Sequence, residues 1–461
     1  MSEGSTRSDD SPQPGFASIQ DSSERSRRIQ RRVMRVAFAA LHTARQGREV
    51  LRRLRGGPHV VDFFHQVDDA YSELALQAVA ELRERYDIVF RFHLVGQADK
   101  FFAPEPEMLA EYARRDCALV APHYGLSFPK GANRPNAELV GRVEALLTDL
   151  RSDSRFIEVG LEAGRALWAG DVEALDKLSE RVPSADAATV REALESGSRT
   201  RAKRRHYSGA MFSYAGEWFW GVDRLHHLER RLIELGASSA GKKNTIRFDR
   251  PPLDAGETQN DARLRLEMFP SLRSPYTAMI FDRTVRLAES VDIPLELSPV
   301  MPMVMRGVPA PGAKGIYIMT DALREAKHIG APFGDMHDPI GSPVLRGFSL
   351  WPFARDQGRG AQYLSSFLSA AFAEGRSTGT DEGLRFVVER AGLDWQEAAP
   401  FLDREEWRDE LEANRQTMYE ELGAWGVPSY RLSGSDGEPD LCVWGQDRLW
   451  LVAAEIKRRL A

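Results

Sequence analysis

The residues best placed to do chemistry lie in "FPSLRSPYTAM" (269–279), where Ser274 and Pro275 follow an apolar, strand-like run and precede a helical pattern. A helix N-terminus carries partial positive charge and unpaired backbone N–H groups, which favour an anion such as a thiolate. The Ser274 hydroxyl would add one more donor. The plainer interpretation is that Ser274 only caps the helix, with Pro275 at its first position.

The surroundings of this motif occur twice in the chain. A shift of 205 residues aligns "PEMLAEYARRDCALVAPHYGLSF" (106–128) with "PGAKGIYIMTDALREAKHIGAPF" (311–333), and seven of the 23 positions are identical. Near the two ends, "FWGVDRL" (219–225) matches "VWGQDRL" (443–449) at a shift of 224. We therefore predict two homologous units, each running strand, helix, strand, long helical stretch, hairpin and closing helix.

This order predicts an α/β protein of two tandem thioredoxin-like domains, each with an inserted helical subdomain. The predicted parts are a disordered tail (1–25), a basic amphipathic helix (26–57), a first domain (58–236), a linker (237–259) and a second domain (260–461).

Composition narrows the class of protein. The chain has 461 residues, too many for one ordinary core, and two cysteines, Cys117 and Cys442, with no C-x-x-C. This cysteine usage excludes a disulfide framework, a zinc ribbon and a dithiol redox centre, and it favours a reducing cytoplasm. The N-terminus is not expected to be a secretory signal, and no metal site is expected.

Charge is concentrated near the N-terminus. Residues 25–55 contain eleven Arg and a single acid, Glu49, with apolar residues such as Ile29, Val33 and Val36 at helical spacing. The first interpretation is a helix docked on the acidic remainder of its own protein. An anionic membrane surface or an acidic partner is the second, and nucleic acid is not expected.

At these motifs the second half of the chain resembles the 2-hydroxychromene-2-carboxylate isomerase family and the related kappa-class glutathione transferases. Both are thioredoxin-fold proteins of the DsbA type. The matching pieces, in order, are "SPY" (274–276), the segment 311–333, "AFAEGRSTGTDEGLRFVVERAGLD" (371–394), "GVPSY" (426–430) and "VWGQDRL" (443–449).

The resemblance implies glutathione as the cofactor. Ser274 would hydrogen-bond its sulfur, and in such surroundings the thiol pKa falls. Val427 and Pro428 match the family's cis-proline loop, whose backbone pairs with the cysteinyl part of glutathione. The alternative for Pro428 is an ordinary loop proline.

The resemblance also implies three residues that hold the charged ends of glutathione. Lys314 would meet a carboxylate, although a solvated helix lysine is nearly as consistent with the sequence. Gln446 and Asp447, at the start of the last helix, would hold the γ-glutamyl end. The alternative is a helix cap with Arg448 in a surface ion pair.

The first domain differs at the corresponding positions: Asp69 stands for Ser274, Ala70 for Pro275, Leu109 for Lys314 and Met211 for Pro428. A carboxylate beside a thiolate would repel it and raise the thiol pKa. The first domain is therefore predicted to be a non-catalytic copy that packs on the second as an internal pseudo-dimer. Association into a homo-oligomer is left open, and His328, which recurs as His123, is assigned to the scaffold.

The predicted function is a glutathione-dependent isomerase or transferase acting on an aromatic or otherwise electrophilic small molecule. Arg273, directly before the serine, predicts a cationic pocket mouth that suits an acidic substrate. The Arg-rich segment is expected to contribute nothing to glutathione binding. The alternative is a non-catalytic binding or assembly protein with a thioredoxin fold.

Overall fold

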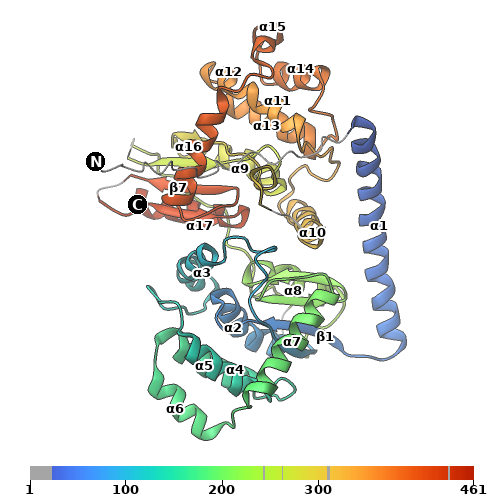
Figure 1. The fold of residues 1–461 in the computed structure, drawn as a ribbon, viewed down its shortest axis with the longest axis vertical. Coiled ribbons are helices and arrows are strands. Elements are labelled where there is room, and N and C mark those ends of the chain that lie inside the picture. The colour runs from blue at the N-terminus through green and yellow to red at the C-terminus, as the bar shows by residue number, and fades with distance from the viewer. Residues whose placement is uncertain (1–22, 242–243, 262, 309–311, 435–436) are drawn as a thin grey trace, which may run out of the picture.

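The computed structural model describes residues 23–461, apart from 242–243, 262, 309–311 and 435–436. Two four-stranded sheets form the two halves of the molecule (Figure 1). The predicted disordered tail lies almost wholly outside the described residues, and Glu24 and Arg25 at its end already belong to the first helix.

The N-terminal unit runs from β1 to α8. Its sheet and covering helices are β1 (His59–His65), α2 (Ala70–Arg85), β2 (Ile88–Leu94), β3 (Met211–Tyr214), β4 (Glu217–Trp220) and α8 (Leu225–Glu234). The inserted helices are α3 (Pro106–Val120), α4 (Ala137–Thr148), α5 (Phe156–Ala169), α6 (Val172–Arg181) and α7 (Ala187–Lys203). The strand order is β2-β1-β3-β4, with β1 parallel to β2 and antiparallel to β3.

The C-terminal unit runs from β5 to α17 and repeats this topology as β6-β5-β7-β8. Its framework is β5 (Arg265–Phe269), α9 (Pro275–Ser290), β6 (Leu295–Leu297), β7 (Ser429–Ser433), β8 (Leu441–Trp444) and α17 (Leu449–Leu460). The inserted helices are α10 (Gly312–Ile329), α11 (Ser342–Ser349), α12 (Trp351–Asp356), α13 (Gly360–Phe372), α14 (Asp381–Arg390), α15 (Trp395–Ala398) and α16 (Trp407–Glu420).

The hydrophobic pattern explains the central strands. All of β1 except Val60 is buried, and so is all of β5 except Arg265, because each strand has a neighbour on both sides and helices on its faces. The edge strand β2 instead alternates between less and more exposed residues, and only Phe92 and Leu94 are buried. The predicted first strand, helix and second strand are confirmed as β1, α2 and β2.

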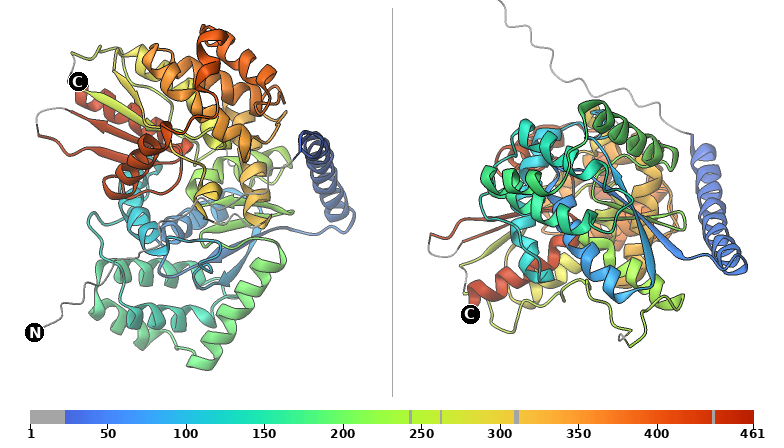
Figure 2. Two further views of the ribbon diagram at one scale, coloured as in Figure 1. Left: turned by 45° about the horizontal axis from the view of Figure 1, so that its top comes forward. Right: turned by 90° about the horizontal axis from the view of Figure 1, so that it is seen from below.

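A 31-residue helix, α1 (Glu24–Leu54), lies along one side of both units (Figures 1 and 2). Near its start Arg31 pairs with Asp335 of the C-terminal unit, and towards its end Arg45 lies 2.7 Å from Glu217 of the N-terminal unit. These contacts near both ends of α1 show a helix that is docked on acidic groups of its own protein. This was the first interpretation of the sequence.

The segment predicted as a linker is packed into the molecule. Phe248 is fully buried, and the backbone N–H of Asp87 donates to the carbonyl of Ala237 at 2.8 Å. Arg250 reaches the contact between the two units. Among the described residues, no helix combines the length and the apolar run needed to cross a membrane.

Candidate functional site

Ser274 caps α9, as the sequence predicts. Its Oγ accepts a hydrogen bond from the backbone N–H of Thr277 at 3.1 Å, and Pro275 is the first helical residue. The same hydroxyl also donates to the carbonyl of Val427 at 3.3 Å. Ser274 therefore does more than cap a helix, because it connects the start of α9 to the loop before β7.

The Val427–Pro428 peptide bond is cis, which confirms the prediction made for this loop. The next residue, Ser429, opens β7 and pairs with Phe269 at the end of β5. The end of the central strand, the start of α9 and the start of β7 thus meet at one place. Ser274, Val427 and Pro428 are brought together there.

Two further hydroxyls near Ser274 escaped the sequence analysis. Ser271 Oγ and Thr277 Oγ1 are buried and have no hydrogen-bond partner among the described residues. Buried polar groups are normally paired, so each of these hydroxyls could accept a partner that is not protein. The sequence did offer one signal that could have identified these two hydroxyls, because each lies three residues from Ser274.

Arg273 does not make the site cationic. Its guanidinium forms two 2.8 Å hydrogen bonds with the carboxylate of Asp338, so the predicted cationic pocket mouth is wrong. Arg27 of α1 in turn donates to the carbonyl of Asp338 at 2.7 Å. The Arg-rich helix therefore reaches the segment that pairs with Arg273, and its dispensability for glutathione binding stays a prediction.

Lys314 contacts the other unit. Its Nζ donates to the carbonyl of Phe102 at 2.9 Å, and burial lowers the pKa of the ammonium to about 8. The alternative of a solvated helix lysine is therefore wrong. Its pairing with a glutathione carboxylate stays a prediction.

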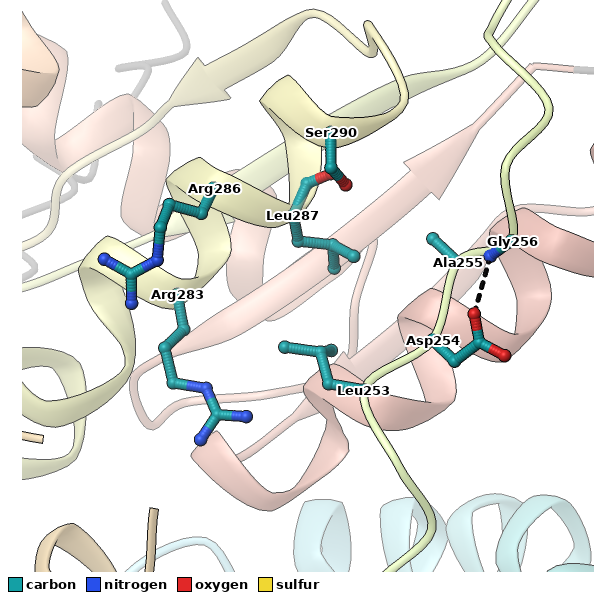
Figure 3. A pocket seen from close by; sticks show the side chains of 8 residues that line it. All are labelled: Leu253, Asp254, Ala255, Gly256, Arg283, Arg286, Leu287 and Ser290. Atoms are coloured by element: carbon teal, nitrogen blue, oxygen red, sulfur yellow. Dashed lines mark hydrogen bonds between the residues drawn. The ribbon is translucent and has the colours of Figure 1, made fainter. Parts of the chain in front are cut away.

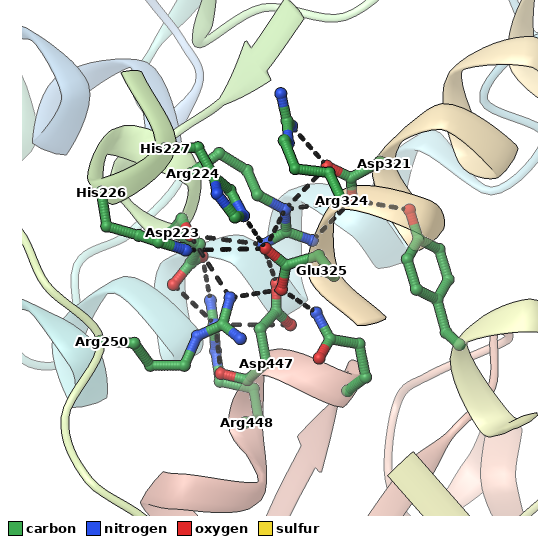
Figure 4. A network of polar contacts seen from close by, with 12 residues as sticks. Asp223, Arg224, His226, His227, Arg250, Asp321, Arg324, Glu325, Asp447 and Arg448 are labelled. Carbon is green, nitrogen blue, oxygen red and sulfur yellow. Dashed lines mark hydrogen bonds and ion pairs between the residues drawn. The ribbon is translucent and has the colours of Figure 1, made fainter. Parts of the chain in front are cut away.

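Asp447 faces the N-terminal unit within a polar network (Figure 4), and its neighbour Gln446 is buried. Gln446 Nε2 donates to Glu325 at 2.6 Å, and the carboxylate of Asp447 pairs with Arg224. Burial alone would raise the pKa of Asp447, but the nearby guanidinium groups outweigh it and lower that pKa. Asp447 is thus committed to the contact between the units, whereas Gln446 bonds within its own unit and its Oε1 is buried with no hydrogen-bond partner among the described residues.

The ion pairs of this network are reciprocal. Arg448 lies 2.6 Å from Asp116, and Arg224 lies 2.9 Å from Asp321. The two arginines occupy equivalent positions of the repeat, and so do the two aspartates. Arg448 is buried, so the alternative that placed it in a surface ion pair is wrong.

Asp69 takes the place of Ser274 in the N-terminal unit. It caps α2, accepting from the backbone N–H of Tyr71 at 3.1 Å and from Ser72 Oγ at 2.9 Å. Burial raises the pKa of its carboxyl to about 6. The equivalent position therefore holds an acid whose oxygens accept hydrogen bonds from its own helix.

Strand pairing corrects one predicted equivalence. Met211 opens β3 as Ser429 opens β7, and each pairs with the equivalent residue of its central strand. The preceding residues are therefore equivalent, so Ala210, not Met211, stands for Pro428. The carbonyl of Ala210 accepts from the backbone N–H of Gly221 at 2.8 Å. The carbonyl of Pro428 accepts in the same way from Gly445 at 2.9 Å.

Neither cysteine is an activated nucleophile. Burial raises the pKa of the Cys117 thiol well above its ordinary value and that of Cys442 to about 11. Reactive cysteines need a lowered pKa. This agrees with the sequence-based exclusion of dithiol chemistry.

A separate cavity of 410 Å³ lies between the segment 253–256 and the last turns of α9 (Figure 3). Arg283 and Arg286 lie on one side of the cavity and the segment 254–256 on the other. Leu253 and Leu287 lie between them. It is at the opposite end of α9 from Ser274, so it is distinct from the predicted glutathione site.

Comparison with known families defines the class of the second half. Residues 265–457 match the family of the DSBA-like thioredoxin domain. The C-terminal unit is therefore a DsbA-like thioredoxin domain. No curated protein matches the chain by sequence.

Three solved structures illustrate what the chain is similar to. A 2-hydroxychromene-2-carboxylate isomerase matches with 19% identity over 42% of this chain and 94% of its own, with a TM-score of 0.35. The cytosolic disulfide reductase DsbM from Pseudomonas aeruginosa matches with 21% identity over 43% of this chain and 100% of its own, with a TM-score of 0.35. The same reductase determined with GSH matches with 19% identity over 42% of this chain and 99% of its own, with a TM-score of 0.33.

Proposed function

We propose that the C-terminal unit binds glutathione beside Ser274 and acts as a glutathione-dependent isomerase or transferase on an aromatic or otherwise electrophilic small molecule. One observation carries this proposal. The Ser274 hydroxyl, at the N-terminus of a 16-residue helix, lies 3.3 Å from the carbonyl that precedes the cis proline.

The residues present fit such a ligand. Ser271 and Thr277 supply buried hydroxyls without a described partner, and the carbonyl of Val427 has only the Ser274 hydroxyl as its side-chain donor in the described contacts. An extended cysteinyl backbone can pair with the backbone of Val427, as an added strand would. No residue of α9's first turn is acidic, so the helix end keeps its positive character.

When bound, glutathione supplies a thiolate that adds reversibly to a conjugated double bond. The chain's own residues make that anion available. Ser274 Oγ would turn its proton from the Val427 carbonyl to the sulfur, and the positive N-terminal end of α9 would stabilise the negative charge. Because glutathione would be regenerated unchanged, isomerisation would need neither oxidant nor reductant.

We propose further that the N-terminal unit is a non-catalytic copy in an internal pseudo-dimer. Two observations support this: the buried acid Asp69 at the position of Ser274, and the reciprocal ion pairs made by Arg224 and Arg448. We place the protein in the cytoplasm, since its two thiols are unpaired and are not activated.

The competing function is a non-catalytic binding or assembly protein. It is favoured by the burial of Ser274, which is 7% exposed. Calorimetric titration with glutathione distinguishes the two. A glutathione-dependent enzyme binds one equivalent and lowers the thiol pKa of the bound tripeptide, whereas an assembly protein leaves that pKa at its value in free glutathione.

A further inference from the structure

The repeat is broken at one place in the contact between the units. After the shared Asp-Arg-Leu sequence, α8 continues with His226 and His227, whereas α17 continues with Trp450 and Leu451. The two histidines are buried, as are the tryptophan and the leucine. Apolar residues can therefore fill this part of the architecture, and the fold alone does not require histidine.

The helix that faces α8, α10, also differs from its equivalent in the other unit, α3. Glu325 on α10 faces the histidines, and its equivalent on α3 is Val120. Both are fully buried. A buried carboxylate is unfavourable unless it is paired, so its presence on one side of the repeat calls for a specific reason.

The three side chains converge on one point (Figure 4). His227 Nε2 lies 2.6 Å from Glu325 Oε1, and His226 Nε2 lies 3.8 Å from the same oxygen. One potential ligand atom from each residue fits within a 4.8 Å span. Two imidazoles and a carboxylate are a donor set that zinc accepts. Ligand atoms of a tetrahedral zinc ion are roughly 3.3 Å apart, so on binding the hydrogen bond between His227 and Glu325 would open and His226 would move closer.

His226 is the residue that points most directly to a ligand. It is fully buried, and neither of its ring nitrogens has a hydrogen-bond partner among the described residues. A buried imidazole normally pairs both nitrogens, one as donor and one as acceptor. A metal ion would take the free lone pair.

The surroundings hold the carboxylate for such a role. Glu325 Oε2 is fixed by Arg250 and by Gln446, each at 2.6 Å, which leaves Oε1 on the side of the histidines. Outer partners of this kind commonly orient a carboxylate that binds a metal ion. Arg224 Nε is 3.6 Å from Oε1 and would need to give way slightly.

The local charge balance also permits a cation. The surrounding network contains the carboxylates of Asp116, Asp223, Asp321, Glu325 and Asp447 and the guanidinium groups of Arg224, Arg250, Arg324 and Arg448. Within this set, which leaves out the Arg230 that contacts His328, carboxylates exceed guanidinium groups by one.

His328 stands close by but is not counted as a ligand. Its ring centroid is 4.7 Å from that of His226. Its Nδ1 accepts from the guanidinium of Arg230 at 3.0 Å, which leaves the proton on the other nitrogen.

We propose that His226, His227 and Glu325 form a buried site for Zn²⁺ or a similar transition-metal ion. The histidines come from α8 of the N-terminal unit and the glutamate from α10 of the C-terminal unit. The ion would therefore join the two units. The site lies in the contact between them, apart from the group around Ser274.

The test uses the full-length protein, stripped with a chelator and titrated with Co²⁺ as a spectroscopic probe. We expect one equivalent to bind with visible d–d absorption, Zn²⁺ to displace it, and the unfolding temperature to rise with either ion. His227→Leu, which installs the residue found at the equivalent position 451, and His226→Leu should each weaken binding by more than roughly 100-fold.

His123→Leu is the matched control, because His123 occupies the equivalent of His328 on the other side of the repeat. It should bind Co²⁺ like the unaltered protein. If His226→Leu and His227→Leu also bind normally, the assignment is wrong. Should these variants fail to fold, the unaltered protein decides, since absence of d–d absorption and of a Zn²⁺-dependent rise in unfolding temperature would overturn the proposal.

Discussion

Arg448 of the C-terminal unit and Asp116 of the N-terminal unit form a buried ion pair, with 2.6 Å between Nη2 and Oδ2. Arg224 and Asp321 form the same pair in the opposite direction. Each unit thus supplies the arginine for the other's aspartate. Contacts of this kind are what a two-fold symmetric interface between like surfaces produces.

The first prediction concerns this pair. Arg448→Ala would leave Asp116 buried and without its principal partner, so we expect the free energy of unfolding to fall by roughly 3–5 kcal/mol. Urea denaturation measures it. Arg458→Ala on α17 is the control, because Arg458 is 54% exposed and an exposed pair contributes only about 0–1 kcal/mol. Equal losses in the two variants would show that the Arg448 contact has no special role.

The second prediction concerns pH. Burial raises the pKa of Glu73, on α2, from 4.5 to about 7. The folded protein therefore holds this proton more tightly than the unfolded chain, so its stabilising effect is present at low pH and is lost as pH rises through this range. Glu73→Gln keeps the shape of the side chain but cannot ionise.

We expect the unaltered protein to lose stability relative to Glu73→Gln between about pH 5 and pH 8, by as much as roughly 3 kcal/mol. Chemical denaturation of both proteins at several pH values provides the measurement. A difference between them that does not change with pH would contradict the assignment of a raised pKa to this carboxyl.

The third prediction concerns the outward face of α1. Ile29, Val33 and Val36 are 55–65% exposed, and Arg25, Arg28 and Arg32 are exposed beside them. An exposed apolar stripe flanked by arginines suits an anionic membrane surface. We expect the protein to sediment with vesicles that contain anionic lipid, and less so as salt is raised.

The double variant Val33→Asp/Val36→Asp should lose most of that binding. Val172→Asp, which alters an exposed apolar residue on α6, should retain it. Sedimentation of the double variant equal to that of the unaltered protein would exclude this face of α1 as the contact.

Local patterns were predictable from the sequence. The first strand, the helix after it and the Ser274 cap depend on neighbours within a few residues, and the cis bond before Pro428 followed from the family resemblance. Met211 was misaligned because the copies differ in length before the hairpin. Only the pairing of strands shows that Ala210 is the true equivalent.

The contact between the units was not predictable in the same way. Asp447 and Arg224 are 223 residues apart, and nothing near either residue reveals the other. The pairing of Arg273 with Asp338, which are 65 positions apart, was hidden for the same reason. His226 and His227 are adjacent in the sequence, but Glu325 joins them only through the fold.

The central claim is that Ser274 activates a bound glutathione thiol. Ser274→Ala removes one charge-assisted hydrogen bond, worth roughly 1.5–3 kcal/mol, which should raise the thiol pKa in the complex by about one to two units. The variant also removes a helix cap, so its secondary structure must first be shown unchanged. Asp69→Ala, the equivalent change in the N-terminal unit, is the control.

The decisive measurement is the ultraviolet absorbance of the thiolate in the glutathione complex, titrated against pH for the unaltered protein and both variants. We predict a titration shifted upward by about one to two pH units in Ser274→Ala, and an unshifted titration in Asp69→Ala. A thiol titration that is the same in Ser274→Ala as in the unaltered protein would contradict the role given to Ser274.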